Sequence, residues 1–485
     1  MAVVRTARPR FAPEHGLGQR PFLLGLTTGV VHFAGTLYWL VDVMAIYGGL
    51  SVPVACGVAA LLVAYLALFP AAFAAIVALL ARRMGPAAAL LAPAVWVTTE
   101  LGRTYLWDGF PWALLGTSQA TVLPVAQAAS VVGVYGVSFV VVMGSAAAAY
   151  AACGRRARAP VVALALACLA GIAGWGRWRL EASSLLTTGE PVVVGLVQGN
   201  FAQDVKWDPA MAPTIVERYV TLTEQAIASG ARLVVWPESA LPFYFAQTPL
   251  EAARVRELAR KGGIYLLFGS DEIEAAPPDD AGDNRVRLYN SAFLLKPDGK
   301  VGAVYRKIQL VPFGEYVPAR RLLFFAAPLV EAVSGFSAGE RHVTLPVDGH
   351  VASTAICYEV VYPGLMRRFV GEGSELLTTI TNDAWFGRSS AAYQHFEQAM
   401  MRAVEEGRYL VRAANTGISG VVDPYGRVLA STRLFDTAVL VEEVRYLRAR
   451  TVYSRVGDLM AYLSLALTVL AVVAVRRPAG DRRRR

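Results

Sequence analysis

Long apolar blocks separated by short polar loops fill the first third of the chain. They lie at about residues 22–47, 51–80, 87–101, 123–152 and 160–176, and a sixth block follows at 459–475. A helix needs about 20 apolar residues to cross a bilayer, and every block except the third is close to or above that length. The third block is short and ends at Glu100. It either extends further along the chain or lies partly inside a helix bundle.

The pattern changes between about residue 190 and residue 445. There, β-branched runs alternate with charged helical stretches and Pro/Gly turns, which is typical of an α/β domain. We therefore expect a basic N-terminal segment at 1–21, about five membrane helices at 22–180, an α/β domain at 190–445, a C-terminal membrane helix at 458–476 and a basic tail at 477–485.

Composition supports membrane insertion and argues against a nucleic-acid partner. Of the 485 residues, 55% are hydrophobic and 17% are charged, and the mean hydropathy is +0.43. An ordinary soluble domain is about 45–50% apolar and about 25% charged. The net charge is +9, but arginines gather in the two tails, beside hydrophobic segments. This placement is typical of orientation signals and lipid-headgroup contacts, so we expect membrane lipids as partners and no nucleic acid.

The basic loops predict which side of the membrane each segment faces. Arg82 and Arg83 follow the second block, and Arg155, Arg156 and Arg158 follow the fourth, whereas the loop after the first block has no Lys or Arg. By the positive-inside rule, the basic segments face the cytoplasm. Five crossings would then put the α/β domain on the opposite face, and the sixth helix would return the tail to the cytoplasm. The first block lacks a small-residue cleavage site, so no cleavable signal sequence is expected.

Cys357 is the only cysteine of the predicted α/β domain, because Cys56, Cys153 and Cys168 lie in or beside the membrane blocks. It lies in the run STAICYEVVYP at 353–363. Buried cysteine is normally inert filler. A cysteine where a strand gives way to a helix can instead be a nucleophile, with a pKa that the helix amides lower. The run itself leaves both interpretations open.

Two further polar residues follow predicted strands. Glu238 comes after an apolar run that ends in Trp236-Pro237. Proline cannot continue a central strand, so Glu238 is predicted at the strand end, where α/β sheets bind ligands. Lys307 follows the run VGAVYR, and a lysine near an acyl-transfer site can hold a developing oxyanion. In the plainer interpretation, Glu238 is a solvated loop carboxylate and Lys307 is a surface strand cation.

The order of these motifs resembles a known enzyme superfamily. WPES at 236–239, YRK at 305–307 with LVPFGEYVP at 310–318, and ICYE at 356–359 are similar to the Glu-Lys-Cys triad segments of nitrilases. With membrane helices on both sides, the chain resembles the apolipoprotein N-acyltransferase family of bacterial inner membranes. Supporting segments are VQGNFAQDVKWD at 197–208, YNSAFLL at 289–295, TNDAWFG at 381–387, QHFEQAMMRA at 394–403, RAANTGISG at 412–420 and DGFPWALLGTSQ at 108–119. That family usually has seven helices before the catalytic domain, and five are predicted here.

The resemblance implies a multi-pass helical bundle with an extracytoplasmic α/β domain, a nitrilase-like αββα sandwich. It implies Glu238 as the general base, Lys307 as the oxyanion-stabilising lysine and Cys357 as the nucleophile. It also implies supporting or substrate-binding roles for Trp207, Asn290, Glu315, Tyr358, Glu359 and Asn382.

The implied reaction is the last step of lipoprotein maturation. A fatty acyl chain moves from a membrane phospholipid, through a Cys357 thioester, to the N-terminal amine of a diacylglyceryl-cysteine apolipoprotein. We expect a monomer in the bacterial inner membrane with its catalytic domain on the periplasmic side. The alternative is a membrane-anchored nitrilase-like hydrolase of a small amide or nitrile. A transporter or scaffold with a dead enzyme domain would have no reason to keep all three triad residues.

No cofactor or metal is expected. The sequence has no GxxxxGK[ST] phosphate loop, and its five histidines show no metal-ligand spacing.

Two apolar loops predict how a lipid reaches the site. Residues 241–245, which include Phe243, follow Glu238, and residues 322–330, which include Phe324, follow the Lys307 segment. Prolines interrupt both loops, and clustered exposed aromatics often mark a membrane or ligand surface. We predict that Phe243 and Phe324 line a membrane-facing mouth that holds the acyl chain. In the alternative, both loops are short buried elements of the α/β core.

Overall fold

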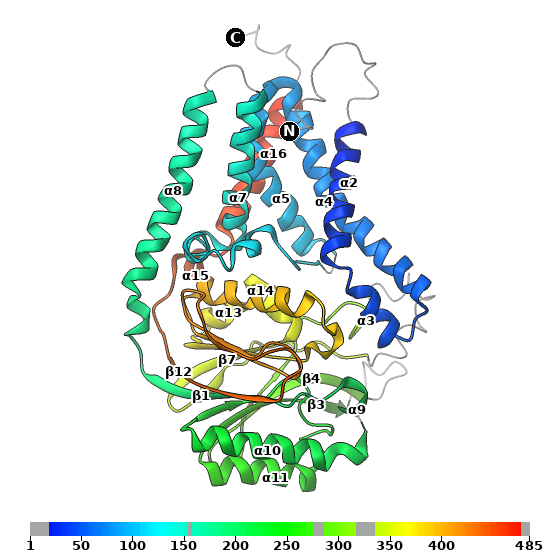
Figure 1. The fold of residues 1–485 in the computed structure, drawn as a ribbon, viewed down its shortest axis with the longest axis vertical. Helices are drawn as coiled ribbons and strands as arrows, with labels where there is room; N and C mark the ends of the chain where they lie inside the picture. Colours follow the sequence, from blue (N-terminus) through cyan, green and yellow to red (C-terminus); the bar gives the residue numbers. More distant parts are fainter. Residues whose placement is uncertain are drawn as a thin grey trace. The chain divides into compact units, whose positions relative to one another are not determined.

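The computed structural model describes residues 19–107, 109–153, 158–206, 208–275, 286–316 and 335–476 (Figure 1). The chain divides into two compact units. The helical unit comprises Met1–Val41, Ser51–Glu181 and Val456–Arg485, and the α/β unit comprises Asp42–Leu50 and Ala182–Arg455.

The helical unit follows the apolar blocks closely. Its elements, with the short α3 at the boundary of the two units, are α2 (Gln19–Thr36), α3 (Leu40–Ile46), α4 (Val52–Met84), η2 (Gly85–Leu91), α5 (Ala92–Tyr105), η3 (Leu115–Gln119), α6 (Leu123–Ala126), α7 (Ala129–Cys153), α8 (Arg158–Ala182) and α16 (Leu459–Arg476). Among the described residues, four stretches are long and apolar enough to cross a membrane: Val52–Tyr105, Ala129–Cys153, Arg158–Leu186 and Leu459–Arg476. The pair α2 and α3, bent by 53°, would make a fifth.

The third apolar block forms α5, which has only 14 residues. It continues from α4 through η2 and packs back against α4 (Figure 1). At a rise of 1.5 Å per residue it is about 21 Å long, shorter than the ~30 Å hydrocarbon layer. The count of five crossings before the α/β unit therefore stays a prediction.

Small residues allow α2 and α4 to pack closely. A Cβ atom added at Gly29 would lie 2.7 Å from the Cα atom of Ala67 on α4, which is closer than side chains tolerate. Membrane helices commonly associate through such small residues, because lipid gives them no hydrophobic driving force toward each other.

The described part of the α/β unit contains two six-stranded sheets. The first has the strand order β12-β1-β2-β3-β4-β5 and the second the order β11-β10-β9-β8-β7-β6. The strands are β1 (Pro191–Gln198), β2 (Leu233–Val235), β3 (Tyr265–Ala275), β4 (Val286–Leu295), β5 (Val301–Arg306), β6 (Leu345–Val347), β7 (His350–Ile356), β8 (Leu376–Thr381), β9 (Leu410–Ala414), β10 (Gly420–Val422), β11 (Val428–Ser431) and β12 (Ala438–Arg445).

Helices cover the outer faces of the two sheets, and the sheets pack against each other (Figure 1). Helices α10 (Ala212–Ala228) and α11 (Pro249–Gly262) lie over the first sheet, and α13 (Pro363–Gly371) and α14 (Ala391–Glu406) lie over the second. The remaining elements are η4 (Ser184–Leu186), α9 (Gln203–Lys206), η5 (Pro209–Met211), η8 (Cys357–Val361), η9 (Asp383–Phe386) and α15 (Val452–Val456). The predicted αββα sandwich is confirmed.

An aromatic core fixes the end of strand β2. Trp236 is fully buried, stacks on Tyr219 of α10 with ring centroids 4.9 Å apart, and donates its indole N–H to Thr223 Oγ1 at 2.8 Å. Large aromatic side chains contribute strongly to core stability, and a buried indole N–H needs such a partner. The chain is therefore held firmly just before Glu238.

The loop that follows Glu238 belongs mostly to this core. Leu241 and Phe245 are buried, and Phe243 is half-buried against the same core cluster. The expected membrane-facing mouth is therefore wrong for Leu241 and Phe245, because their side chains fill the space under α10 and α11. It stays a prediction for Phe243. Phe324 and its loop lie outside the described residues.

Candidate active site

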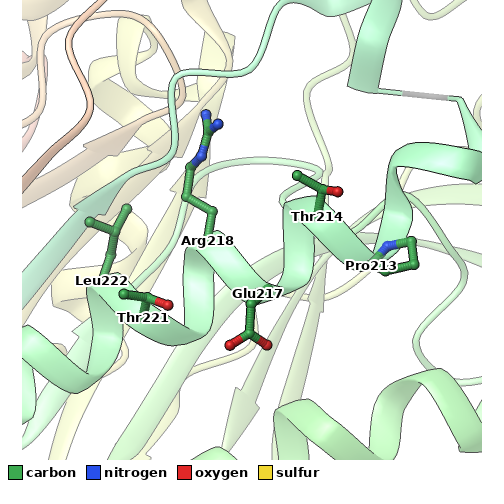
Figure 2. Close-up of a pocket in the computed structure, with 6 residues that line it drawn as sticks. All are labelled: Pro213, Thr214, Glu217, Arg218, Thr221 and Leu222. Carbon is green, nitrogen blue, oxygen red and sulfur yellow. The ribbon is translucent and has the colours of Figure 1, made fainter.

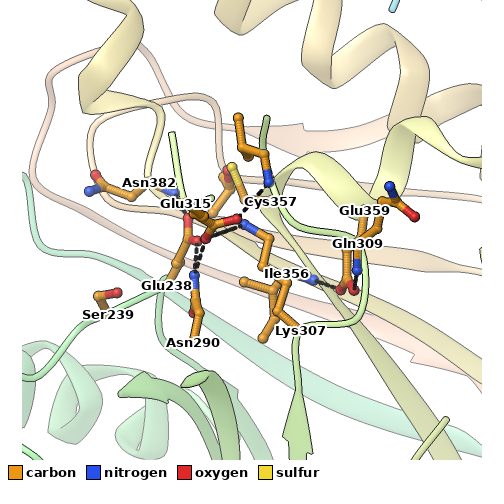
Figure 3. Close-up of polar contacts among 12 residues, drawn as sticks. Glu238, Ser239, Asn290, Lys307, Gln309, Glu315, Ile356, Cys357, Glu359 and Asn382 are labelled. Atoms are coloured by element: carbon orange, nitrogen blue, oxygen red, sulfur yellow. Dashed lines mark hydrogen bonds and ion pairs between the residues drawn. The ribbon is translucent and has the colours of Figure 1, made fainter. Parts of the chain in front are cut away.

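Glu238 lies just past the end of β2, as predicted, but it is buried and not solvated. Its side chain accepts two hydrogen bonds: Oε1 from Asn290 Nδ2 at 2.7 Å and Oε2 from the backbone N–H of Asn382 at 2.9 Å (Figure 3). Asn290 lies on β4 of the first sheet, and Asn382 follows β8 of the second. The carboxylate is therefore held between the ends of strands from both sheets.

Lys307 follows β5 directly and is also buried, with 1% of its side chain exposed. Its Nζ lies 2.8 Å from Glu315 Oε1 and 3.5 Å from Glu238 Oε1. Burial alone would lower the pKa of Lys307, but the carboxylates of Glu315 and Glu238 outweigh it and raise that pKa above its usual value. Lys307 is therefore a fixed cation between two carboxylates, and not the surface strand cation of the plainer interpretation.

Cys357 follows strand β7 directly and is the first residue of the short 3₁₀ helix η8. Its φ of +52° lies in the left-handed region, which costs a non-glycine residue roughly 1–3 kcal/mol. The α-helix expected at this point begins only at Pro363. Burial first, and then the charge of Glu238, raise the pKa of the Cys357 thiol, although Lys307 opposes them. The expected lowering of this pKa is therefore wrong, and the resting thiol is neutral.

The three side chains converge in one buried place. Figure 3 shows Cys357 beside the carboxylates of Glu238 and Glu315, with Lys307 reaching the same point from below. The charge of Cys357 contributes to the raised pKa of Lys307, and the charge of Glu238 contributes to the raised pKa of Cys357. A neutral thiol next to a carboxylate and a cation can form a nucleophile by passing its proton to the carboxylate during attack.

Glu359 ties the two sides of this site together. Its Oε1 accepts hydrogen bonds from Tyr305 Oη at 2.7 Å, from the Ile308 N–H at 2.7 Å and from the Gln309 N–H at 3.0 Å. Its Oε2 accepts one from the Ile356 N–H at 2.7 Å (Figure 3). Burial raises the pKa of Glu359 to about 7. The residue links the loop after Lys307 to the turn that carries Cys357.

The other predicted residues surround this centre, where they are described. Glu315 also accepts a hydrogen bond from the Val311 N–H at 2.8 Å, so it is itself held in place. Asn382 donates to Gln203 Oε1 at 2.6 Å. Tyr358 is buried and meets the Tyr362 ring edge-on. Trp207 lies outside the described residues.

Two further buried ionisable residues, Lys206 and Asp271, lie near Glu238, and the sequence interpretation gave neither of them a role. Lys206 Nζ donates to the backbone carbonyl oxygen of Glu238 at 3.0 Å, and Ser239 Oγ donates to Asp271 Oδ1 at 3.3 Å. Burial lowers the pKa of Lys206 to about 8 and raises the pKa of Asp271 to about 7. Asp271 lies in an ordinary-looking strand run, so no short motif marks it.

A surface hollow of about 680 Å³ lies elsewhere, along α10 (Figure 2). Its lining residues are Pro213, Thr214, Glu217, Arg218, Thr221 and Leu222. It is lined by one carboxylate, one guanidinium and two threonine hydroxyls but by no cysteine or lysine, so acyl transfer is better placed at the Cys357 site. Among the described residues, no group of three or more His, Cys, Asp or Glu side chains is arranged to hold a metal ion.

Known protein families match both units of this chain. Residues 193–452 match the family model for carbon-nitrogen hydrolase, and residues 12–147 match the model for the apolipoprotein N-acyltransferase N-terminal domain. An apolipoprotein N-acyltransferase of Geobacter metallireducens is 42% identical over 95% of this chain and 88% of its own length. One of Rhodopseudomonas palustris is 35% identical over 95% of this chain and 87% of its own length.

Some solved structures are similar to part of this chain. An amidase from Nesterenkonia covers 58% of this chain and 100% of its own, with 22% identity and a TM-score of 0.41. A member of branch 10 of the nitrilase superfamily from Saccharomyces cerevisiae covers 62% of this chain and 98% of its own, with 20% identity and a TM-score of 0.41.

Proposed function

This chain belongs to the apolipoprotein N-acyltransferase family, and from that membership we propose that it moves a fatty acyl chain from a membrane phospholipid to the N-terminal amine of a diacylated apolipoprotein. The observation that carries the proposal is the buried meeting of Glu238, Lys307 and Cys357, with Lys307 Nζ 3.5 Å from Glu238 Oε1. We assign Glu238 as general base, Lys307 as oxyanion donor and Cys357 as nucleophile.

The first half-reaction forms a thioester. Glu238 takes the thiol proton while Cys357 Sγ attacks the ester carbonyl carbon of the phospholipid. The negative charge on the carbonyl oxygen is stabilised by Lys307 Nζ and by the backbone N–H of Tyr358, since preorganised donors act strongly in a site shielded from water. The C–O bond then breaks, and the proton held by Glu238 passes to the leaving oxygen. Lysophospholipid departs, and the acyl chain stays on Cys357.

The second half-reaction consumes the thioester. The α-amine of the apolipoprotein attacks the thioester carbonyl, and Glu238 takes a proton from the amine nitrogen. The C–S bond breaks, Glu238 returns the proton to sulfur, and an amide is released. A thioester is more reactive toward an amine than an oxygen ester is, so the order of steps favours transfer. Burial of all three triad side chains limits hydrolysis of the intermediate.

The supporting residues act on the triad. Asn290 and the Asn382 N–H hold the Glu238 carboxylate, and Glu315 holds Lys307. Glu359 fixes the turn that carries Cys357, and Tyr358 of the same turn supplies the backbone N–H that we assign to the oxyanion. Trp207, outside the described residues, keeps its predicted supporting role. One copy of the chain supplies the whole triad, so we propose that a monomer suffices.

A membrane-anchored amidase or hydrolase is the alternative, and the reaction products separate the two. The purified chain would be mixed with phospholipid vesicles and a diacylated lipopeptide, and the products measured by mass spectrometry. We expect triacylated lipopeptide and lysophospholipid in equal amounts, with neither formed by the Cys357→Ala variant. Free fatty acid without lipopeptide acylation would indicate the hydrolase.

We further propose that the chain lies in the bacterial inner membrane with its α/β unit on the periplasmic side. The basic loops around Arg82–Arg83 and Arg155–Arg156 support this orientation. An alkaline phosphatase reporter, active only outside the cytoplasm, should work when fused after residue 190 and fail when fused at the C-terminus. The opposite pattern would put the α/β unit in the cytoplasm and contradict the proposal.

A further inference from the structure

A buried charged cluster that the proposed reaction does not use contacts the main chain of Cys357. It consists of Asp383 of η9, His395 of α14 and Arg412 of β9, with essentially no exposed surface. His395 Nε2 lies 3.0 Å from the carbonyl oxygen of Cys357. Arg412 Nη2 lies 2.8 Å from Asp383 Oδ2 and 2.9 Å from His395 Nδ1.

The partners of His395 determine where its proton lies. The Cys357 carbonyl can only accept a hydrogen bond, so Nε2 must carry the hydrogen. His395 Nδ1 lies 2.9 Å from Arg412 Nη2, which can only donate, and 3.1 Å from Asp383 Oδ1, which can only accept. Because the one hydrogen of a neutral ring is on Nε2, Nδ1 accepts from Arg412. Burial and the charge of Arg412 lower the pKa of His395 and keep the ring neutral. The Cys357 carbonyl thus requires the tautomer with its hydrogen on Nε2, and Arg412 stabilises that tautomer by donating to Nδ1.

The Arg412 side chain is itself fixed by Asp383. Burial alone would raise the pKa of Asp383, but Arg412 and His395 outweigh it and hold that pKa below its usual range. Thr381 Oγ1 also donates to Asp383 Oδ1 at 2.9 Å. The buried ion pair of Arg412 and Asp383 therefore holds His395 at Nδ1. Functional histidines are commonly oriented in this way, by a partner on the ring nitrogen that does not do the work.

The hydrogen bond from His395 has a consequence on the other side of the peptide. A trans peptide is planar, and its C=O and N–H point in opposite directions. Holding the Cys357 carbonyl therefore also fixes the Tyr358 N–H, which points away from His395. Cys357 has a φ of +52°, in a region that non-glycine residues avoid, so its conformation depends on such external contacts.

We propose that His395 is a positioning residue, whose Nε2–H holds the Cys357–Tyr358 peptide so that the Tyr358 N–H faces the oxyanion of the acyl-transfer step. Asp383 and Arg412 act through His395 by fixing its tautomer. The proposal rests on the proposed function, because only acyl transfer develops an oxyanion at this place. A cluster that merely stabilised the core would affect every reaction of Cys357 alike.

Two conservative variants separate these roles. His395→Gln keeps an amide donor at about the reach of Nε2, whereas the shorter side chain of His395→Asn matches only the Nδ1 side. Acylation would be followed in detergent micelles as the burst of p-nitrophenol from p-nitrophenyl butyrate. Losing a held oxyanion donor costs up to about 10²–10³-fold, so the Asn variant should be slower by about tenfold to a hundredfold and the Gln variant by less than about fivefold.

Alkylation of Cys357 by iodoacetamide supplies the second measurement, because that displacement forms no oxyanion. It should proceed in both variants within about twofold of wild type, since the thiol and Glu238 are unchanged. His350→Asn is the matched control: His350 pairs with Glu190 and Glu375, away from Cys357, and its replacement should change neither rate. If the His395→Asn chain does not fold, Asp383→Asn takes its place, with an expected acylation loss of about tenfold, the lower end of the usual cost of removing the partner that orients a histidine.

Equal acylation by the Asn and Gln variants would overturn the proposal, as would a parallel fall in alkylation and acylation. The wild-type burst separates this inference from the proposed function. A wild-type chain that shows no burst contradicts the proposed function and this role together. An active wild type with an equally active Asn variant contradicts the positioning role alone.

Discussion

Two buried glutamates of the α/β unit, Glu238 and Glu359, differ in how their oxygen atoms are used. A carboxylate has about four acceptor positions. Glu359 fills them with four donors, three of which are backbone N–H groups. Within the described part of the chain, Glu238 accepts two close hydrogen bonds and faces Lys307 Nζ at 3.5 Å.

The difference separates a structural carboxylate from a reactive one. A carboxylate whose acceptor positions are filled by the main chain holds segments together, and those donors keep a thiol or an amine from reaching its oxygen atoms. A carboxylate that is oriented by two partners but not filled can still take a proton from a thiol or an amine. Burial alone does not distinguish the two, since both side chains are nearly inaccessible.

The largest effect is expected at Glu238. Glu238→Gln should lower acyl transfer by about 10²–10⁴-fold, because a general base is lost, while the thermal unfolding midpoint stays close to wild type. The charge of Glu238 raises the pKa of Cys357, so removing that charge should increase the thiolate fraction. Alkylation by iodoacetamide at pH 9 should therefore become faster while acyl transfer falls. Acyl transfer by Glu238→Gln at a rate close to wild type would contradict the assignment of Glu238 as base.

A slightly smaller loss is expected at Lys307. Lys307→Met should slow acyl transfer by about 10²–10³-fold, the usual cost of removing an oxyanion donor. It should also lower the free energy of unfolding by about 3–5 kcal/mol, because Glu315 and Glu238 would remain buried without their cation.

The double variant Lys307→Met with Glu315→Gln separates these two effects. Removing the charge of Glu315 should recover much of the stability without recovering activity. Recovery of activity in the double variant would show that Lys307 only balances charge. Chemical denaturation and the lipopeptide assay together give both readings.

At Glu359 we expect the opposite of the Glu238 result: a marked loss of stability and a smaller loss of activity. In Glu359→Gln one amide N–H₂ must face a backbone donor, and leaving a buried group unsatisfied costs about 1–3 kcal/mol. We expect a clearly lower unfolding midpoint and a loss of acyl transfer of about tenfold, caused by a loosened Cys357 turn. A variant as inactive as Glu238→Gln but fully stable would show that Glu359 takes part in the chemistry.

The smallest effect is expected at Phe243, which is only half-buried. Phe243→Ser should slow thioester formation from phospholipid vesicles by about threefold to tenfold. Fully burying a phenyl group contributes roughly 1.5–3 kcal/mol, and only part of the Phe243 ring can contact a fatty acyl chain. Acylation by p-nitrophenyl butyrate should stay unchanged. Equal slowing with both substrates would show that Phe243 belongs to the core and not to a mouth.

Much of the site could be predicted because its residues follow strand ends. Glu238 after β2, Lys307 after β5 and Cys357 after β7 each stand where a local apolar run stops. The membrane helices could also be predicted from the local sequence, because length and hydropathy define them. One exception is the first block, where the chain bends between α2 and α3 and the Trp39 indole donates to the Thr36 carbonyl at 3.1 Å. Such a side-chain contact competes with a continuous helix.

The rest could not be predicted, because it depends on segments that meet only in the folded chain. The raised pKa of Cys357 reflects burial, which no local pattern reports. The donors to Glu359 come from strand β5, the loop after it and strand β7. His395 and Arg412 lie in two of the segments that resemble the family, but nothing in those segments indicates that the two side chains meet beside Cys357. The loop at Leu241 and Phe245 was misjudged because an apolar loop has the same composition whether it covers a core or faces a membrane.

The most direct test of Cys357 as the nucleophile is mass spectrometry of the peptide that contains it. The purified chain is first incubated with phospholipid alone, without an acceptor. We expect the mass of this peptide to increase by one fatty acyl group in a thioester that hydroxylamine removes, with an equal amount of lysophospholipid. Adding a diacylated lipopeptide should discharge the adduct onto the lipopeptide amine. An unmodified Cys357 peptide in a preparation that still acylates lipopeptide would contradict the assignment of Cys357 as nucleophile.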